Sequence, residues 1–291
     1  MKIACIPAYN EEQTLPHVIK KVLPYVDKVI VFDDGSNDQT SIVAEKNGAQ
    51  VISNKINQGY GAAIISFFEL ARQNNADVMI TLDGDGQHDP SQIPQLIDEL
   101  SKKNVDVVIG SRFVGKNSKT PRYRKAGIKI ISSTSNLGTK FKVKDSQSGF
   151  RAYSKKAIHL IHPTEKGMSV STEILQKISN KGLKVSEVPV VISYDENSSK
   201  QSSVPQGVQV LINTLKYISV KHPILFFGFP GIALLVVGFI VGYYFLENYL
   251  STNDLFLGSL FGSIILVLLG SILCATSVIL FSMATLMREK Q

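Results

Sequence analysis

Two apolar runs near the end of the 291-residue chain contain no acidic or basic residue. They extend over 25 residues from His222 to Leu246 and over 33 residues from Leu255 to Met287. A bilayer core is about 30 Å thick and is crossed by about 20 helical residues, so both runs are long enough to span it. Buried helices of a soluble protein rarely run so far without a charge on a solvent-facing side. The sequence therefore predicts a transmembrane hairpin over 222–291, with spans at about 223–246 and 257–283.

The charges that flank these runs predict the orientation of the hairpin. Lys216 and Lys221 precede the first run and Arg288 and Lys290 follow the second, whereas the connecting loop has two acids and no base. By the positive-inside rule, both ends of the hairpin lie in the cytoplasm and the loop lies outside. We expect a two-span protein of the cell membrane with both termini inside. The hairpin is too small to argue for a transporter, and a homo-oligomer formed through it is left open.

The part of the chain that precedes the hairpin divides in two. The first apolar run is short and broken by Pro7 and Asn10, which excludes a signal peptide and predicts a cytoplasmic domain over residues 1–203. Residues 204–221 have apolar side chains at helical spacing, which predicts an amphipathic helix along the membrane surface. A helix packed on the preceding domain is the alternative. The apolar positions are Val204, Val208, Leu211, Ile212, Leu215 and Ile218.

Short β-rich runs alternate with helix-like stretches in the first domain. This order predicts an α/β fold in which a mainly parallel sheet has helices on both faces. In such sheets ligands bind at the carboxyl ends of the strands. The strand-like runs are 2–6, 28–32, 49–53, 77–82 and 105–110, and the helix-like stretches are 11–22, 39–46, 60–73 and 91–102.

Polar residues gather where the predicted strands end, most densely in DGDGQHDP at 83–90. No glycine-rich phosphate loop of the dinucleotide or P-loop type is present, so another group must neutralise a bound phosphate. Asp83, Asp85 and the amide oxygen of Gln87 can converge after the strand, which predicts an all-oxygen site for Mg²⁺ or Mn²⁺. A nucleotide diphosphate would complete that coordination. Asp89 precedes a proline and is expected to cap the following helix.

Five motifs in order resemble a known family. They are PAYNEE at 7–12, DDGS at 33–36, DGDGQH at 83–88, GSR at 110–112 and DSQSGFRAY at 145–153. Together they resemble family 2 glycosyltransferases of the GT-A fold, and within these the dolichyl-phosphate mannose synthase and polyprenyl-phosphate glycosyltransferase group. The resemblance implies inverting transfer of a sugar from a nucleotide diphosphate sugar, GDP-mannose or a UDP-sugar, to polyprenyl or dolichyl phosphate at the membrane.

The resemblance also implies roles for single residues. Arg112 would face the diphosphate or the sugar, and with Asp85 and Asp145 it would form the catalytic set. Asp145 is either a base for a hydroxyl acceptor or a structural residue that bonds the amides of the following turn. The base and ribose would lie among Pro7, Tyr9, Glu11, Phe32 and Asp34, and the diphosphate and metal would be held by Asp83, Gly84, Asp85 and Gln87.

The positive charge of the chain is concentrated in one segment. The net charge is +7, and residues 114–166 contain thirteen lysines and arginines against two acids. A basic segment beside a membrane anchor favours lipid head groups and a lipid phosphate over nucleic acid. The candidate residues for the acceptor phosphate are Arg122, Arg124, Lys125, Lys129 and Lys200.

The sequence also departs from the pattern of this family in two ways. It has no tryptophan, which disfavours the processive polysaccharide synthases of the superfamily. Where the group often has an arginine and a lysine before its membrane segment, this chain has Asn197 and Ser203, and Lys200 would substitute for them.

Two alternative functions stay open: a glycosyltransferase acting on a hydroxyl of a lipid-linked glycan, and a non-catalytic protein that binds nucleotide sugars.

Overall fold

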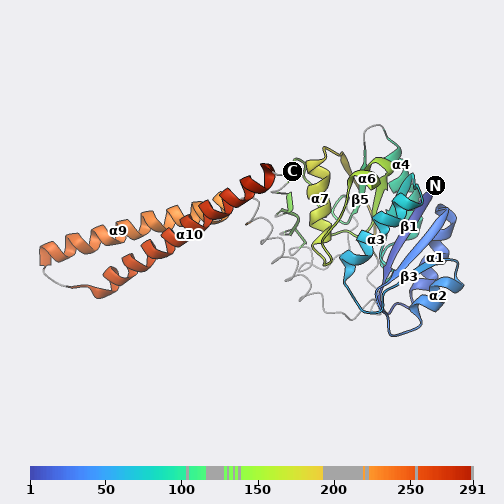
Figure 1. The fold of residues 1–291 in the computed structure, drawn as a ribbon, viewed down its shortest axis with the longest axis horizontal. Helices are drawn as coiled ribbons and strands as arrows, with labels where there is room; N and C mark the ends of the chain where they lie inside the picture. The colour runs from blue at the N-terminus through green and yellow to red at the C-terminus, as the bar shows by residue number, and fades with distance from the viewer. Residues whose placement is uncertain are drawn as a thin grey trace. The chain divides into compact units, whose positions relative to one another are not determined.

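The computed structural model divides the chain into two compact units, Met1–Thr214 and Leu215–Gln291 (Figure 1). The predicted amphipathic helix, apart from Ser219, and the candidate residues Arg122, Arg124, Lys125 and Lys200 lie outside the described residues and stay predictions. The structure describes residues 1–102, 105–115, 128–129, 131–133, 135–136, 139–192, 219, 223–252 and 255–289.

A seven-stranded sheet with the order β3-β2-β1-β4-β6-β5-β7 forms the centre of the first unit. The predicted α/β fold with a mainly parallel sheet is confirmed, but the sheet is mixed because β6 pairs antiparallel with both β4 and β5. The first five strands match the predicted runs, and β6 and β7 were not predicted. The strands are β1 (Lys2–Ala8), β2 (Lys28–Asp33), β3 (Gln50–Ser53), β4 (Val78–Thr81), β5 (Val107–Ser111), β6 (Arg151–Ser154) and β7 (Val185–Pro189).

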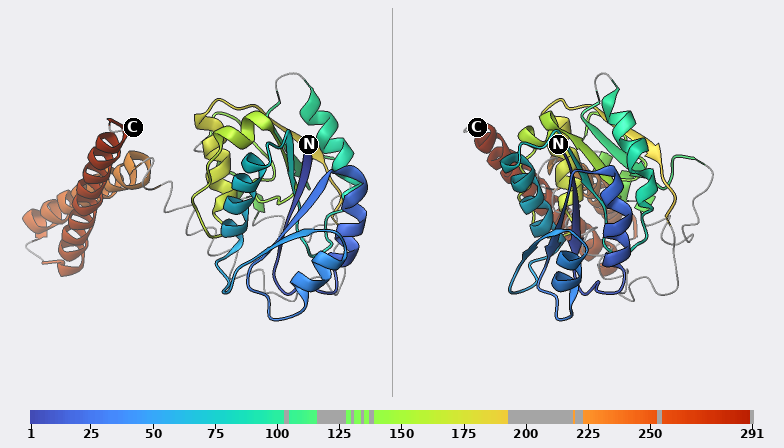
Figure 2. Two further views of the ribbon diagram at one scale, coloured as in Figure 1. Left: turned by 45° about the vertical axis from the view of Figure 1, so that its right-hand side comes forward. Right: turned by 90° about the vertical axis from the view of Figure 1, so that its right-hand side faces the viewer.

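Helices cover both faces of the sheet, and each face has its own apolar core (Figure 2). Because β1, β2 and β4 are buried on both sides, their side chains alternate between the two cores. One face is packed by α1 (Leu15–Val22), α2 (Thr40–Lys46) and α4 (Ile93–Ser101). The other is packed by α3 (Tyr60–Gln73), α6 (Lys155–Leu160) and α7 (Val170–Asn180).

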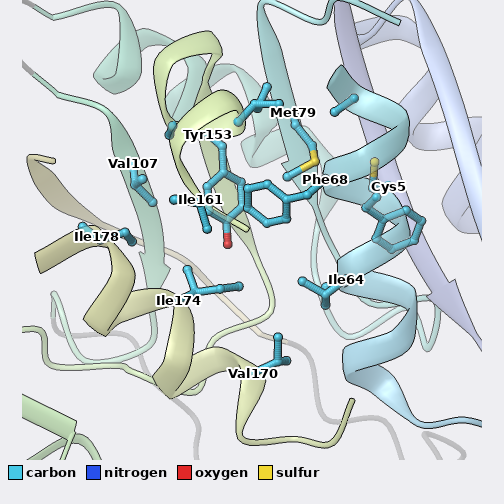
Figure 3. Packing of buried hydrophobic residues seen from close by; sticks show 14 of the residues in the cluster. Cys5, Ile64, Phe68, Met79, Val107, Tyr153, Ile161, Val170, Ile174 and Ile178 are labelled. Carbon is cyan, nitrogen blue, oxygen red and sulfur yellow. The ribbon is translucent and has the colours of Figure 1, made fainter. Parts of the chain in front are cut away.

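The core under α3 is rich in aromatic side chains (Figure 3). The rings of Phe68 and Tyr153 meet edge to face with centroids 5.0 Å apart. Met79 and Cys5 lie beside them and are fully buried. Full burial of each large apolar side chain contributes about 1.5–3 kcal/mol. This packing fixes β1 and β4 side by side, and with them the strand ends that carry the acidic residues.

The second unit is a pair of long apolar helices, α9 (Phe229–Thr252) and α10 (Leu257–Glu289), preceded by a π-helical turn, η3 (Ile224–Gly228). Ile224–Thr252 and Leu257–Met283 are long and apolar enough to cross a membrane, with mean hydropathies of 2.6 and 2.8. Their apolar side chains are largely exposed, as a bilayer requires and water does not favour. Glycine lets the helices touch, since a Cβ on Gly270 would lie 2.8 Å from a backbone oxygen of α9. The two predicted apolar helices are present.

Candidate functional site

The carboxyl ends of β2, β1 and β4 meet at one edge of the sheet. The chain leaves β1 toward α1 on one face and enters β4 from α3 on the other, so this edge is a topological switch point. The hydroxyl of Thr14 ties the segments together, at 2.9 Å from the carbonyl oxygen of Gly84 and 2.7 Å from the carboxylate of Glu11. Gly84 packs tightly here, because a Cβ on it would lie 3.2 Å from the Pro7 carbonyl oxygen.

Acidic side chains crowd this edge. Burial raises the pKa of Asp83 to about 6, although the charge of Arg112 opposes the rise. Burial and the charge of Asp83 raise the pKa of Asp85, whose carboxylate accepts from the Gln87 backbone N–H at 3.0 Å. Burial first, and then the charges of Asp85 and other neighbouring acids, raise the pKa of Glu11.

The donor set of this edge fits a divalent cation that is shared with a ligand. Two carboxylates, Asp83 and Asp85, and the amide oxygen of Gln87 are hard oxygen donors of the kind that Mg²⁺ and Mn²⁺ accept. Within the described part of the chain, no group of three His, Cys, Asp or Glu could enclose a metal. A cation bound here would therefore complete its coordination with water and phosphate oxygens.

The loop that follows β4 is held by its own residues. The backbone N–H of Asp83 points to Nδ1 of His88 at 3.4 Å, and burial lowers the pKa of His88 to about 4, so its ring is neutral. The ring packs on Phe150 with centroids 5.2 Å apart. Asp89 caps the next turn by accepting from the Ser91 N–H at 3.0 Å, as the sequence predicts.

Arg112, after β5, is gripped by Asp145. Its Nε and Nη2 each donate to a different carboxylate oxygen at 2.6 Å, and its backbone N–H donates to the same carboxylate at 3.1 Å. Asp145 is completely buried. Both carboxylate oxygens accept from the arginine in this geometry, and the expected roles of Asp145 as a base or as a support for the following turn stay predictions. The carboxylate orients Arg112, whose charge reaches Asp83.

A second arginine lies behind the acidic edge and was not predicted. Arg151 is 2% exposed and donates to the carbonyl oxygens of Ser146 and Ser148 at 2.7 and 2.8 Å. Its charge lowers the pKa of Asp83 against the effect of burial. It sits opposite Thr81 in the β4–β6 pairing. The only sequence signal was its place in DSQSGFRAY, since its position depends on a strand that the pattern did not reveal.

Two residues expected around the base have other contacts. Phe32 is 3% exposed and packs edge-on against Phe67 in the core, with centroids 6.1 Å apart, so it is not open to a nucleotide. Asp34 is also buried, and it accepts from the Asn54 side chain and from the backbone N–H groups of Gln58 and Gly59 at 2.7–2.9 Å. Its carboxylate therefore organises the loop before α3.

Three more of the predicted site residues lie among the described residues. Pro7 and Tyr9 are half-buried at the end of β1, beside the acidic edge, and Lys129 is exposed. The structure brings Glu11, Asp83, Gly84, Asp85 and Arg112 into one neighbourhood.

The fold is that of GT-A glycosyltransferases. Among solved structures, glucosyl-3-phosphoglycerate synthase from Mycobacterium tuberculosis in complex with Mn²⁺ and UDP-glucose matches with a TM-score of 0.59, covering 74% of this chain and 78% of that one at 22% identity. The model of glycosyl transferase family 2 matches residues 3–161. The chain belongs to this family and is a glycosyltransferase.

Two curated relatives match over most of their length. One is a UDP-N-acetylglucosamine–dolichyl-phosphate N-acetylglucosaminyltransferase from Methanococcus voltae, 31% identical over 231 residues, which are 71% of this chain and 89% of the relative. The other is a dolichol-phosphate mannosyltransferase from Pyrococcus furiosus, 30% identical over 255 residues, which are 81% of this chain and 70% of the relative.

Proposed function

We propose that this glycosyltransferase moves a sugar from a nucleotide diphosphate sugar to a polyprenyl or dolichyl phosphate, with inversion, at the cytoplasmic face of the membrane. The observation that carries the proposal is the placement of Asp83 and Asp85 at one sheet edge, where the charge of Arg112 acts on Asp83. Relatives named for dolichyl phosphate and the two apolar helices of this chain support a lipid acceptor.

The donor would be held through its diphosphate. Asp83, Asp85 and Gln87 would bind Mg²⁺ or Mn²⁺, which supplies a Lewis acid for the leaving diphosphate. Arg112 adds a preorganised positive charge at the same place, because Asp145 fixes its guanidinium before substrate arrives. Pro7, Tyr9 and Glu11 would lie beside the base and ribose of the donor. The loop organised by Asp34 would complete the donor pocket.

The acceptor would need little help from a base. A phosphate monoester loses its second proton near pH 6, so at cell pH it is already an anionic nucleophile. This agrees with an Asp145 whose carboxylate is occupied by Arg112. Lys129, together with Arg122, Arg124 and Lys125, would hold the acceptor phosphate, and Lys200 would assist from the segment before the hairpin.

The orientation of the chain follows from the same proposal. Residues 1–203 would form the cytoplasmic catalytic domain and 204–221 a juxtamembrane helix. The hairpin over 222–291 would anchor both to the inner face, with both termini inside.

The test is to supply purified full-length protein with polyprenyl phosphate, Mn²⁺ and a panel of labelled UDP- and GDP-sugars, and to measure label that enters organic solvent. We expect one donor to label the lipid, and we expect Asp85→Asn or removal of the metal to abolish labelling without unfolding the protein. A parallel reaction receives a lipid-linked glycan in place of polyprenyl phosphate, and label that enters only the glycan would favour the alternative acceptor. Nucleotide binding that needs no metal and gives no turnover would favour a non-catalytic protein.

A further inference from the structure

The backbone that carries Asp145 is held from one side by Glu187. This glutamate lies on β7, opposite Ile109 of β5. Its carboxylate accepts from the backbone N–H of Lys144 at 2.9 and 3.0 Å and from the backbone N–H of Asp145 at 3.0 Å. Hydrogen bonds to a charged acceptor are about twice as strong as neutral ones, so this contact defines where the two amides lie.

Ser132 holds the same backbone from the other side. Its Oγ accepts from the backbone N–H of Ser146 at 3.0 Å and donates to the Ser146 hydroxyl at 3.1 Å. Both serines are at most 3% exposed, so water does not compete for these bonds. We call Glu187 and Ser132 together the 144–146 clamp, because they fix three consecutive residues of the chain from two different elements.

The clamped segment carries the contacts of both arginines near the acidic edge. Asp145 grips Arg112 with both of its oxygens, and the carbonyl oxygen of Ser146 accepts from Arg151 at 2.7 Å. Both guanidinium charges act on Asp83. A shift of residues 144–146 would therefore move the guanidinium groups of Arg112 and Arg151 away from the proposed site of the diphosphate, where negative charge develops during the reaction.

We infer that Glu187 and Ser132 are positioning residues that fix Arg112 through Asp145. This inference rests on the proposed function of Arg112 at the donor diphosphate. Among the described residues the hydrogen bonds of the clamp go to residues 144–146, so their effect should pass through the two arginines that this segment holds, and chiefly through Arg112, which Asp145 binds with both oxygens. A misplacement of about 1 Å at a catalytic group can cost about 100-fold in rate, and loss of one clamp residue should cost about tenfold.

The experiment is a double-mutant cycle in the full-length protein. Glu187→Ala and Ser132→Ala are each made alone and together with Arg112→Lys. The single ammonium of lysine cannot donate the two parallel hydrogen bonds that the guanidinium donates to Asp145. The affinity for UDP and GDP with Mn²⁺ is measured by calorimetry, and turnover by lipid labelling. We expect each clamp variant to weaken nucleotide binding and turnover about tenfold alone and less than twofold in the Arg112→Lys background. Glu187→Gln keeps an acceptor oxygen and should recover part of the loss.

Two variants control for general loss of stability. Ser135→Ala removes a hydroxyl that is equally buried but faces Thr172 at 3.3 Å. Glu99→Ala removes a carboxylate that bonds the hydroxyl of Ser186, next to Glu187. Both should bind nucleotide as the wild type does.

The outcomes separate the two proposals. Clamp variants that bind nucleotide like the wild type, or that lose as much in the Arg112→Lys background as alone, would overturn the positioning role. Because nucleotide binding needs no acceptor, the cycle still decides the inference if the wild type labels no lipid, in which case only the proposed acceptor fails.

Discussion

Replacing Gly149 with alanine should lower the turnover of the enzyme while leaving the fold intact. A Cβ at this position would lie 2.7 Å from Oδ1 and 2.9 Å from Oδ2 of Asp83. The glycine itself cannot move away easily, because its carbonyl oxygen accepts from the Thr81 hydroxyl at 2.7 Å. The carboxylate, at the end of a rotatable side chain, is the group that must shift.

The size of the effect follows from these distances. Ordinary contact begins at 3.4 Å, so Oδ1 has to move by about 0.7 Å from its place 2.7 Å away. Since about 1 Å of misplacement can cost 100-fold, we expect turnover to fall about 10- to 50-fold. The cost in stability should stay below about 1 kcal/mol, because a partly exposed carboxylate can rotate without opening a cavity.

Turnover is measured by lipid labelling, metal-dependent nucleotide binding by calorimetry, and stability by thermal unfolding in detergent. The matched control is Gly167→Ala, where a Cβ would meet nothing within 4 Å, and this variant should behave as the wild type does. A Gly149→Ala protein with turnover within twofold of the wild type would refute the view that the position of Asp83 matters to the reaction. A protein that fails to fold would refute the argument that the carboxylate yields.

Three further predictions rest on single contacts. Gly61→Ala should destabilise the protein by about 2–3 kcal/mol in denaturant unfolding, since its Cβ would lie 2.1 Å from a backbone carbonyl oxygen that cannot rotate away. Asp34→Ala should weaken UDP or GDP binding about tenfold, because the loop before α3 loses three hydrogen bonds, and unchanged affinity would place that loop away from the donor. Burial alone would raise the pKa of Glu173, but hydrogen bonds from Thr164 and neighbouring residues lower it below 4.5. The charged carboxylate therefore stabilises the fold above pH 4.5, and this stabilisation is lost as the pH falls through the pKa of the folded state. Glu173→Gln should therefore cost about 2 kcal/mol at pH 7 and progressively less as the pH falls below 4.5, and a pH-independent difference would contradict this.

The parts of the fold that the sequence reveals are those with local signals. The first five strands are apolar runs between turn residues, and the two long helices show as uncharged runs. By contrast, β6 and β7 have four and five residues with polar side chains among them, so neither length nor alternation marks them. They are strands because β4 and β5 offer them partners, and pairing between distant segments leaves no local pattern.

The same limit applies to the site. The acidic motif and Arg112 can be recognised because they follow strands whose ends must meet. Which way a side chain points is harder to predict, because a strand buried on both faces has no alternation between apolar and polar residues. Phe32 thus turns into the core with Phe67, although it directly precedes the polar motif. The contacts of Asp34 and Asp145 join residues at least 20 positions apart, which spacing alone does not reveal.

The commitment of Asp145 to Arg112 bears on the chemistry of the acceptor. A hydroxyl acceptor has to lose a proton during attack, so it needs a carboxylate with a free oxygen near the sugar. At this edge Asp145 is buried against an arginine, Glu11 accepts from the Thr14 hydroxyl, and Asp83 and Asp85 are the proposed ligands of a cation. A phosphate acceptor arrives without the proton that a base would remove. The geometry of the described residues is therefore better matched to an anionic lipid phosphate than to an alcohol, and it makes the charge of Arg112, rather than proton transfer, the quantity on which turnover should depend.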